Sequence, residues 1–308
     1  TSRRQRQMCI RDRVSATENI LPSGVRQRQF VWSVSALVKR KLVQICTALL
    51  YNGNFAGFTT GNIWKGSSKN ICLPGLNCYS CPGALGACPL GSLQSSLSGV
   101  FLRIPFYVLG FILLFALIFA RLICGWGCPF GLVQELLYKI PTPKLQRNRF
   151  TYLLSYLKYF IALVFLLLLP LAFYQFTGSG VPAFCKFICP AGTLEAALPL
   201  AFFKPQIREL LGQLFIWKLS LLCLTVLAAI FIYRPFCRFI CPLGAIYGLF
   251  NKISLFGIKV NTVKCINCDR CMEHCKMDCR HVGDRECIAC GECRKVCPVK
   301  AISLGKKF

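Results

Sequence analysis

Eight cysteines near the end of the chain stand at intervals that leave few choices for how that segment folds. They form two runs, Cys265-x2-Cys268-x2-Cys271-x3-Cys275 and Cys287-x2-Cys290-x2-Cys293-x3-Cys297-Pro298. In such runs each C-x2-C-x2-C turn directs three sulfurs at one iron-sulfur cube, and the fourth cysteine ligates the cube of the other run. The spacing therefore predicts one [4Fe-4S] cluster on Cys265, Cys268, Cys271 and Cys297, and a second on Cys287, Cys290, Cys293 and Cys275. Two complete runs fit neither a zinc site nor a disulfide framework.

Two residues in this segment depart from the usual pattern. Lys276 stands where proline usually follows the last cysteine of a run, and Cys279 is a spare thiol close by. Because outer groups tune a metal site, either residue is expected to alter solvent access or potential at the cluster held by Cys275.

The rest of the chain is apolar enough to lie in a membrane. The 308 residues are 55% hydrophobic and include 22 cysteines, and residues 42–60, 100–123, 153–176 and 214–233 each approach the roughly 20 apolar residues that span a bilayer. We predict an α-helical membrane protein with about four transmembrane helices, short helices that begin at Cys-Pro, and a C-terminal α+β two-cluster ferredoxin domain. The expected boundaries are a disordered segment over residues 1–25, part of which resembles non-native adapter sequence, a transmembrane domain over 26–253 and the ferredoxin domain over 254–308.

Basic residues alternate along the segments that flank the apolar stretches. By the positive-inside rule this pattern places both termini in the cytoplasm of a multi-pass protein of a bacterial inner membrane. The formal charge of +26 is then explained by topology and contact with membrane lipid, so we expect no nucleic-acid partner.

One short motif occurs four times in the apolar part. It reads Cys-Pro-x-Gly and begins at Cys88, Cys128, Cys189 and Cys241. Three copies carry another cysteine four residues earlier, and the longest internal match pairs residues 121–140 with 234–253. Because proline is favoured in the first turn of a helix, each Cys-Pro is expected to begin one, where free amides stabilise thiolates or an anionic cluster. The alternative is that these cysteines are structural thiols or form disulfides.

Topology sorts these cysteines into two sets of four, the number that a further [4Fe-4S] cluster requires. The inner set, at the cytoplasmic ends of the spans, is Cys124, Cys128, Cys237 and Cys241. The outer set is Cys81, Cys88, Cys185 and Cys189, with Cys72 and Cys78 as competing ligands. We therefore expect one or two further clusters, with a disulfide as the rival at the outer side.

Several signatures are missing from the sequence. His274 and His281 are the two histidines and both lie in the C-terminal segment, so the apolar stretches offer no histidine ligand for haem. The sequence has no G-x-G-x-x-G for a dinucleotide. All 11 acidic residues lie outside the centres of the apolar stretches, which argues against an autonomous proton pump. Glu135 and Glu195 follow Cys-Pro motifs, and we interpret them as solvated at the membrane interface; the alternative is a proton relay beside a quinone or a thiol.

These motifs, taken together, resemble those of a known family. Residues 121–140 and 234–301 are similar to NapH-type membrane ferredoxins of periplasmic nitrate reductase systems and to the iron-sulfur half of the nitrous oxide reductase regulator. Residues 72–89 resemble a segment of uncharacterised bacterial 4Fe-4S binding membrane proteins. The resemblance implies electron exchange between a quinol pool or cytoplasmic donor and an extracytoplasmic reductase.

The function predicted is therefore that of an electron-transfer component in an oxidoreductase system, with redox proteins and quinone as expected partners. The alternative is a thiol-disulfide or transport protein that uses ferredoxin electrons to reduce the outer cysteines. Bound iron at the outer cysteines favours the first reading, and a reversible disulfide there favours the second.

Overall fold

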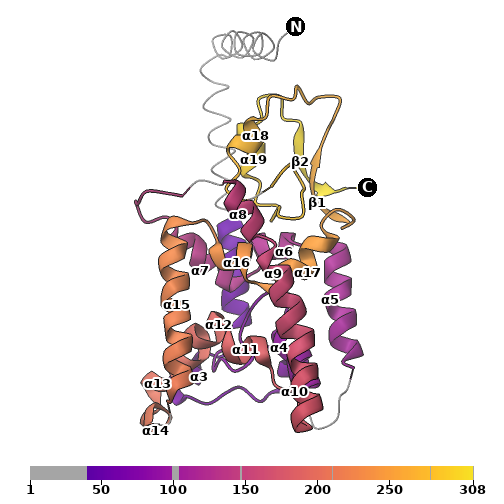
Figure 1. The fold of residues 1–308 in the computed structure, drawn as a ribbon. Coiled ribbons are helices and arrows are strands. Elements are labelled where there is room, and N and C mark those ends of the chain that lie inside the picture. The colour runs from indigo at the N-terminus through magenta and orange to yellow at the C-terminus, as the bar shows by residue number, and fades with distance from the viewer. Residues whose placement is uncertain (1–39, 99–103, 146–147, 210, 278, 308) are drawn as a thin grey trace.

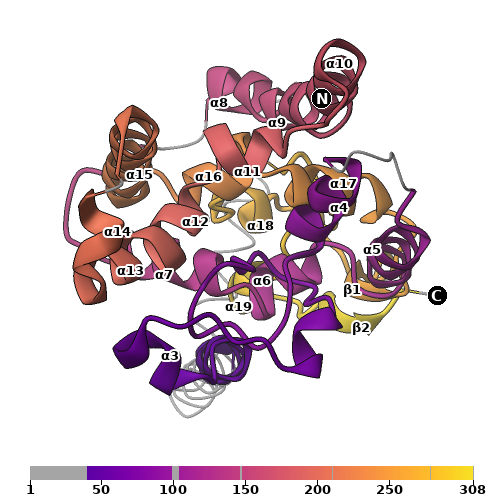
Figure 2. The ribbon, with the colours of Figure 1, turned by 90° about the horizontal axis from the view of Figure 1, so that it is seen from below.

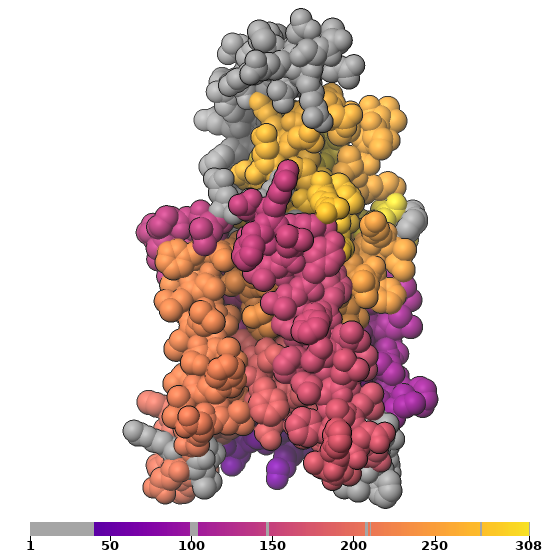
Figure 3. All heavy atoms as spheres, in the orientation of Figure 1, coloured from indigo at the N-terminus to yellow at the C-terminus, as the bar shows by residue number. Residues whose placement is uncertain are grey.

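The computed structural model describes residues 40–98, 104–145, 148–209, 211–277 and 279–307. The predicted disordered segment, residues 1–25, lies outside these ranges. Within them, a mostly helical body extends to residue 253, and a small module with the remaining residues covers one end of it (Figures 1 and 3).

The helical body combines long helices with many short ones. Residues 40–51 are helical and are followed by α3 (Phe55–Thr60), η1 (Ser67–Asn70), α4 (Pro89–Leu97), α5 (Phe106–Ile118), α6 (Leu122–Trp126) and α7 (Pro129–Leu137). A second series comprises α8 (Arg149–Leu154), α9 (Leu157–Ile161), the π-helical η2 (Ala162–Leu168), α10 (Leu169–Thr177), α11 (Ala183–Phe187), α12 (Pro190–Gly192), the π-helical η3 (Thr193–Ala197), α13 (Leu198–Phe203) and α14 (Pro205–Glu209). The body ends with α15 (Gln213–Phe231), α16 (Pro235–Phe239) and α17 (Pro242–Phe250).

The long helices stand at the periphery, around a centre that holds the short helices α6, α11, α12 and α16 (Figure 2). Two of them, the continuous Arg149–Thr177 and Gln213–Phe231, are long and apolar enough to cross a membrane. The other two apolar stretches also form helices among the described residues, but one is interrupted at residues 52–54 and the other is the shorter α5. The four spans expected from the sequence therefore remain a prediction. Large apolar side chains are exposed along these helices, including Phe106, Phe160 and Leu224.

Each Cys-Pro motif begins a helix, as the sequence predicts. Cys88, Cys128, Cys189 and Cys241 are the N-cap residues of α4, α7, α12 and α17, with proline in the first turn of each. The fixed φ of proline suits this position, and its missing N–H would have no partner there in any case. The cysteine side chain is thereby held at the end of a helix where unpaired backbone N–H groups gather.

The C-terminal module, residues 254–307, is built around a two-stranded antiparallel sheet. Strand β1 (Phe256–Val260) pairs with β2 (Ile302–Lys306), with Ile258 opposite Leu304. Two short helices, α18 (Arg270–Glu273) and α19 (Glu292–Val296), follow turns in which Asp269 and Gly291 adopt left-handed backbone angles. The module lies over the end of the body that carries α6, α16 and α17 (Figure 1).

Candidate metal centres

The inner set of cysteines surrounds one buried cavity. Its lining includes all four members of the predicted inner set, together with residues 74–76 of the loop before α4. The two copies of the motif contribute equally, because Cys124 and Cys237 come from α6 and α16 while Cys128 and Cys241 cap α7 and α17. The backbone N–H of Gly131 donates to the sulfur of Cys128. We call these four cysteines the inner site.

Two arginines cross between the copies and hold the inner site together. The guanidinium of Arg121 donates to the carbonyl oxygen of Cys237 at 3.1 Å, and that of Arg234 donates to the carbonyl oxygen of Cys124. Each arginine lies against the motif glycine of the opposite copy, where a side-chain carbon would approach the guanidinium to about 3 Å at Gly131 and Gly244. The internal match of residues 121–140 with 234–253 thus corresponds to an approximate twofold arrangement around the site.

The outer cysteines also gather, but with a different fourth member. Cys78 interacts electrostatically with Cys88 and Cys189. Cys185 interacts with all three of these cysteines. Cys81 faces Asn52 instead, with its sulfur 3.6 Å from the side-chain oxygen. We define the outer site as Cys78, Cys88, Cys185 and Cys189, so that Cys78 takes the place that the sequence analysis assigned to Cys81.

Cys72, the other competing ligand, is turned away from this group. Its sulfur lies 3.9 Å from the hydroxyl of Ser92, and its backbone N–H donates to the hydroxyl of Tyr107.

A position that the sequence analysis missed supports both sites. Six residues after each motif cysteine stands a polar side chain, namely Gln94, Gln134, Glu195 and Tyr247. Gln94 accepts a hydrogen bond from the backbone N–H of Cys185 at 3.0 Å, Gln134 from that of Phe236 at 3.1 Å, and Glu195 from that of Cys78 at 2.6 Å. Gln94, in the copy that begins at Cys88, thus binds Cys185, and Glu195, in the copy that begins at Cys189, binds Cys78. Cys78 therefore has the same position relative to the first of these copies as Cys185 has relative to the second. An alignment of the four motifs by eye would have revealed this position.

The interpretation of Glu135 as a solvated interfacial residue was wrong. Glu135 is only 4% exposed and is bound by Arg40 at 2.9 Å, Arg234 at 2.7 Å and the hydroxyl of Tyr233 at 2.6 Å, with Lys41 also in contact. Burial by itself would raise the pKa of Glu135, but Arg234 and Arg40 lower it to about 2. This carboxylate is therefore a structural counter-ion for the arginine of the second motif copy.

Glu195 was misjudged in the same way. It is half-buried and accepts a hydrogen bond from the backbone N–H of Cys78 in the outer site, so it is not an exposed interfacial residue. Burial raises the pKa of Glu195 to about 7.

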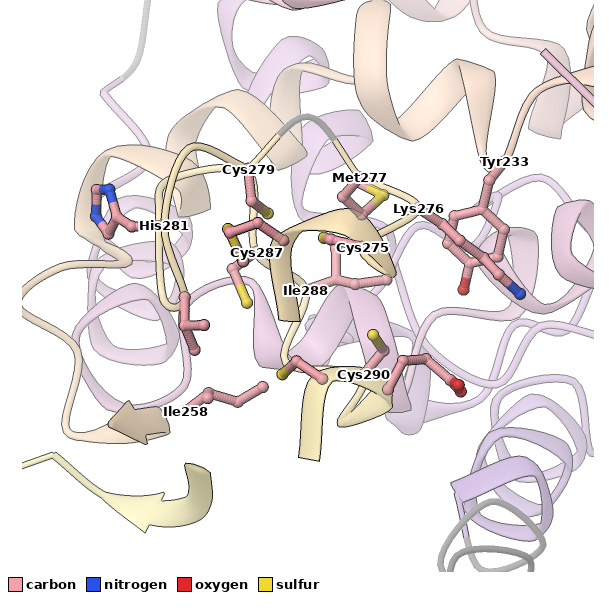
Figure 4. Close-up of a pocket in the computed structure, with 14 residues that line it drawn as sticks. Tyr233, Ile258, Cys275, Lys276, Met277, Cys279, His281, Cys287, Ile288 and Cys290 are labelled. Atoms are coloured by element: carbon pink, nitrogen blue, oxygen red, sulfur yellow. The ribbon is translucent and has the colours of Figure 1, made fainter. Parts of the chain in front are cut away.

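In the C-terminal module, one predicted cluster site forms a cavity. Its lining includes Cys275, Cys287, Cys290 and Cys293, the four predicted ligands of the second cluster (Figure 4). Cys279 also lines this cavity and makes hydrogen bonds with the thiols of Cys275 and Cys287. The bond from Cys279 lowers the pKa of Cys287 to about 6. The spare thiol is thus in contact with two of the expected ligands.

The other predicted ligand set of the module, Cys265, Cys268, Cys271 and Cys297, lies nearer the surface. Cys271 and Cys297 pack against one apolar cluster built on Ile258 and Ile302, and Cys268 interacts electrostatically with Cys271. The sulfur of Cys297 accepts a hydrogen bond from the backbone N–H of Ala301 at 3.3 Å.

A buried ion triad fastens the C-terminal module to the helical body. Glu286 accepts hydrogen bonds from Arg121 at 2.5 Å and from Lys158 at 2.6 Å, and all three side chains are fully buried. Burial would raise the pKa of Glu286, but Arg121 and Lys158 lower it. Close backbone packing adds to this contact, since a side-chain carbon on Gly125 would lie 2.0 Å from the carbonyl oxygen of Ile288.

This contact also brings the second cluster site of the module close to the inner site. Cys287 and Cys290 of that site and Cys124 of the inner site pack against the same buried apolar cluster, to which Ile288 belongs.

The donor sets fit iron-sulfur clusters. The described residues contain no group of three or more histidine, cysteine or acidic side chains at the spacing of ligands to a single metal ion. The cysteines of the inner site and of the Cys275 site instead stand around cavities, as the ligands of a cubane do. Backbone N–H groups directed at the sulfurs of Cys88, Cys128, Cys189 and Cys241 would stabilise the negative charge of a bound cluster.

Comparison with known families agrees with this donor chemistry. A family profile described as "4Fe-4S binding domain" matches residues 104–148, 159–198 and 214–261, and each segment contains one C-x3-C-P unit. A second profile with the same description matches residues 283–303 in the C-terminal module.

Curated relatives give the family. The chain is 30% identical over 207 residues to an uncharacterized protein of Methanocaldococcus jannaschii. The matched region covers 64% of this chain and 77% of the relative. The chain is 26% identical over 220 residues to the ferredoxin-type protein NapH of Haemophilus influenzae, covering 64% of this chain and 66% of the relative. The chain belongs to the NapH-type family of 4Fe-4S proteins. The putative electron transport protein YccM of Escherichia coli is 28% identical over 194 residues, covering 60% of this chain and 50% of the relative.

This NapH-type protein accordingly binds [4Fe-4S] clusters and takes part in iron-sulfur electron transfer. The matched region spans between half and about three quarters of the length of these relatives. No solved structure matches the chain.

Proposed function

We propose that this NapH-type protein is a membrane-bound relay that passes electrons between a cytoplasmic or quinol donor and a membrane or extracytoplasmic acceptor. The proposal includes about four transmembrane helices, both termini in the cytoplasm and the ferredoxin domain at residues 254–308. It assigns four clusters: two on the eight cysteines of the C-terminal module, one on the inner site and one on the outer site.

The observation that carries the proposal is the order of the cysteine sites along the molecule. The C-terminal module lies against the end of the body that holds α6 and α16, whereas α4, α11 and α12 of the outer site lie towards the opposite end (Figure 1). A donor that docks on the module would therefore meet the sites in sequence.

The environment of the membrane cysteines supports cluster binding over a purely structural role. Arg121 and Arg234 flank the inner site, and Lys218 donates to the carbonyl oxygen of Cys185 at the outer site at 3.2 Å. Positive charge beside thiolates favours the net-negative state of a ligated cluster.

Replacement of Cys128 and Cys241 by serine tests the assignment of the inner site. The variant keeps all eight cysteines of the C-terminal module, and we expect it to lose about four irons per chain, one cubane, and to stop delivering electrons to an impermeant acceptor at the outer face. The matched control replaces Cys46 and Cys223, which are exposed and stand in no motif, and should change neither quantity. Unchanged iron and delivery in the first variant would refute the inner cluster.

The outer site distinguishes the relay from a thiol-exchange protein. With Cys78 and Cys189 replaced by serine, the relay loses iron. A thiol-exchange protein would show no change in iron and would lose instead a disulfide that alkylation detects in the oxidised wild-type protein.

A further inference from the structure

One short segment of backbone touches both membrane sites. Residues 74–76 line the cavity of the inner site, and Cys78, two residues further along, belongs to the outer site. A continuous peptide path of a few bonds therefore leads from the wall of one site to a ligand of the other. We call residues 74–78 the bridge segment.

The amides of this segment contact sulfurs on both sides. The backbone N–H of Leu76 donates to the sulfur of Cys128 in the inner site, and the next N–H, that of Asn77, donates to the sulfur of Cys88 in the outer site. The two sulfurs are separated by one step between neighbouring amide nitrogens and by one hydrogen bond at each end, so they lie no more than about 10 Å apart.

Three hydrogen bonds from different parts of the body hold the bridge segment. The hydroxyl of Tyr247 donates to the carbonyl oxygen of Pro74 at 3.1 Å, and the side-chain amide of Asn52 donates to that of Asn77 at 3.1 Å. Glu195 accepts from the N–H of Cys78 at 2.6 Å. Asn77 and Tyr247 are both fully buried.

The bridge segment also packs closely against the backbone of the inner site. A side-chain carbon on Gly75 would lie 3.1 Å from the carbonyl oxygen of Gly127 and 3.4 Å from the α-carbon of Cys128. A β-carbon at this position would make an unusually tight contact with the carbonyl oxygen of Gly127, so glycine suits the close approach of the two backbones.

Tyr247 differs from its counterparts in the other motif copies. Gln94 and Glu195 accept from the backbone N–H groups of Cys185 and Cys78, and Gln134 accepts from that of Phe236, the residue before Cys237. Tyr247 instead reaches the bridge segment. Since α17 begins at Cys241, this hydrogen bond links a helix of the inner site directly to the path that leads to the outer site.

We propose that the bridge segment carries the electron between the inner and outer sites and that Tyr247 is a positioning residue for it. The inference rests on the proposed function, because both sites must hold clusters. One electron leaves one site and one electron arrives at the other, and the segment itself neither gains nor loses a bond. Its peptide bonds and its two hydrogen bonds to sulfur form a continuous path from Cys128 of the inner site to Cys88 of the outer site.

The test is the substitution Tyr247→Phe in the full-length, cluster-loaded protein. It removes the hydroxyl and keeps the ring. Iron content should stay at the wild-type value, while the rate at which an impermeant outer-face oxidant reoxidises the inner site should fall, because the segment is no longer held at Pro74. The magnetic interaction between the two reduced sites, read by electron paramagnetic resonance, should weaken. The control is Tyr159→Phe, a tyrosine whose hydroxyl has no hydrogen-bond partner among the described residues, which should leave all three readouts unchanged.

Asn77→Leu provides a second variant, because it removes the bond from Asn52 and keeps the backbone amides. Wild-type transfer rates and magnetic interaction in both variants, with iron retained, would overturn the bridge and leave the relay intact. A wild-type protein without iron at the inner or outer site would instead contradict the proposed function.

Discussion

Removal of the Glu286 charge is expected to detach the C-terminal module from the helical body. Glu286→Gln keeps the size of the side chain but leaves Arg121 and Lys158 buried without a counter-charge. Breaking a buried ion pair by removal of one partner costs about 3–5 kcal/mol. The docking equilibrium should therefore shift by roughly two to four orders of magnitude.

Hydrogen exchange in detergent or nanodiscs measures this shift directly. In the docked protein the side-chain N–H of Trp126 donates to the carbonyl oxygen of Ala289 at 2.9 Å. The side-chain amide of Asn251 donates to the carbonyl oxygen of Cys287 at 3.1 Å. We expect faster backbone exchange over residues 284–291 in Glu286→Gln, with the iron content of the module unchanged and electron transfer to the inner site reduced. The matched control, Glu273→Gln, makes the same charge change at an exposed position of the module and should cost less than about 1 kcal/mol. Equal exchange in the two variants refutes the role of the triad.

The same triad gives docking a pH dependence. The pKa of Glu286 is lowered in the docked state, so its contribution is fully present above the ordinary glutamate pKa and is lost as pH falls through the lowered value. The protection factor of the amides over residues 284–291, which corrects for the pH dependence of intrinsic amide exchange, should be constant from neutral pH down to about pH 5 and fall below it. A protection factor that stays constant down to pH 3 contradicts this assignment.

Two further predictions concern the spare thiol and the topology. Cys279→Ala removes a hydrogen-bond donor to the ligand sulfurs of Cys275 and Cys287 and should lower the reduction potential of that cluster, because hydrogen bonds to sulfur raise it. Cys279→Ser keeps a donor and should have a potential closer to that of the wild type. Identical potentials in all three proteins would rule out a role for the donor. A topology reporter placed after Lys65 should be active outside the cytoplasm and one after Lys307 inside it, and an outside signal from the Lys307 fusion disproves the assigned orientation.

Local patterns predicted the elements that build the sites. Cys-Pro marks a helix start through the chemistry of proline itself, and all four motifs cap helices as expected. The inner set could be grouped correctly because residues 121–140 and 234–253 are two copies of one sequence, and like copies tend to pair around a shared axis.

Contacts between distant residues could not be predicted in this way. The sequence placed Cys81 in the outer set with Cys72 and Cys78 as competing ligands, because all three precede the first motif. Contacts with Cys88, Cys185 and Cys189, and with Glu195 117 residues further along, identify Cys78. Glu286 and Arg121 are separated by 165 residues, and nothing in either local sequence signals their pairing. Buried counter-ions of this kind depend on the tertiary fold, whereas helix starts depend on neighbouring residues.

The number of iron atoms per chain in anaerobically purified wild-type protein tests the central claim most directly. Four cubane sites predict about sixteen irons, half of them in the C-terminal module. Iron quantitation combined with a redox titration followed by electron paramagnetic resonance should resolve signals beyond those of the module alone. About eight irons per chain, with signals from two clusters, would contradict the account, because the cysteines of the helical body would then hold no cluster and the chain could not relay electrons through it.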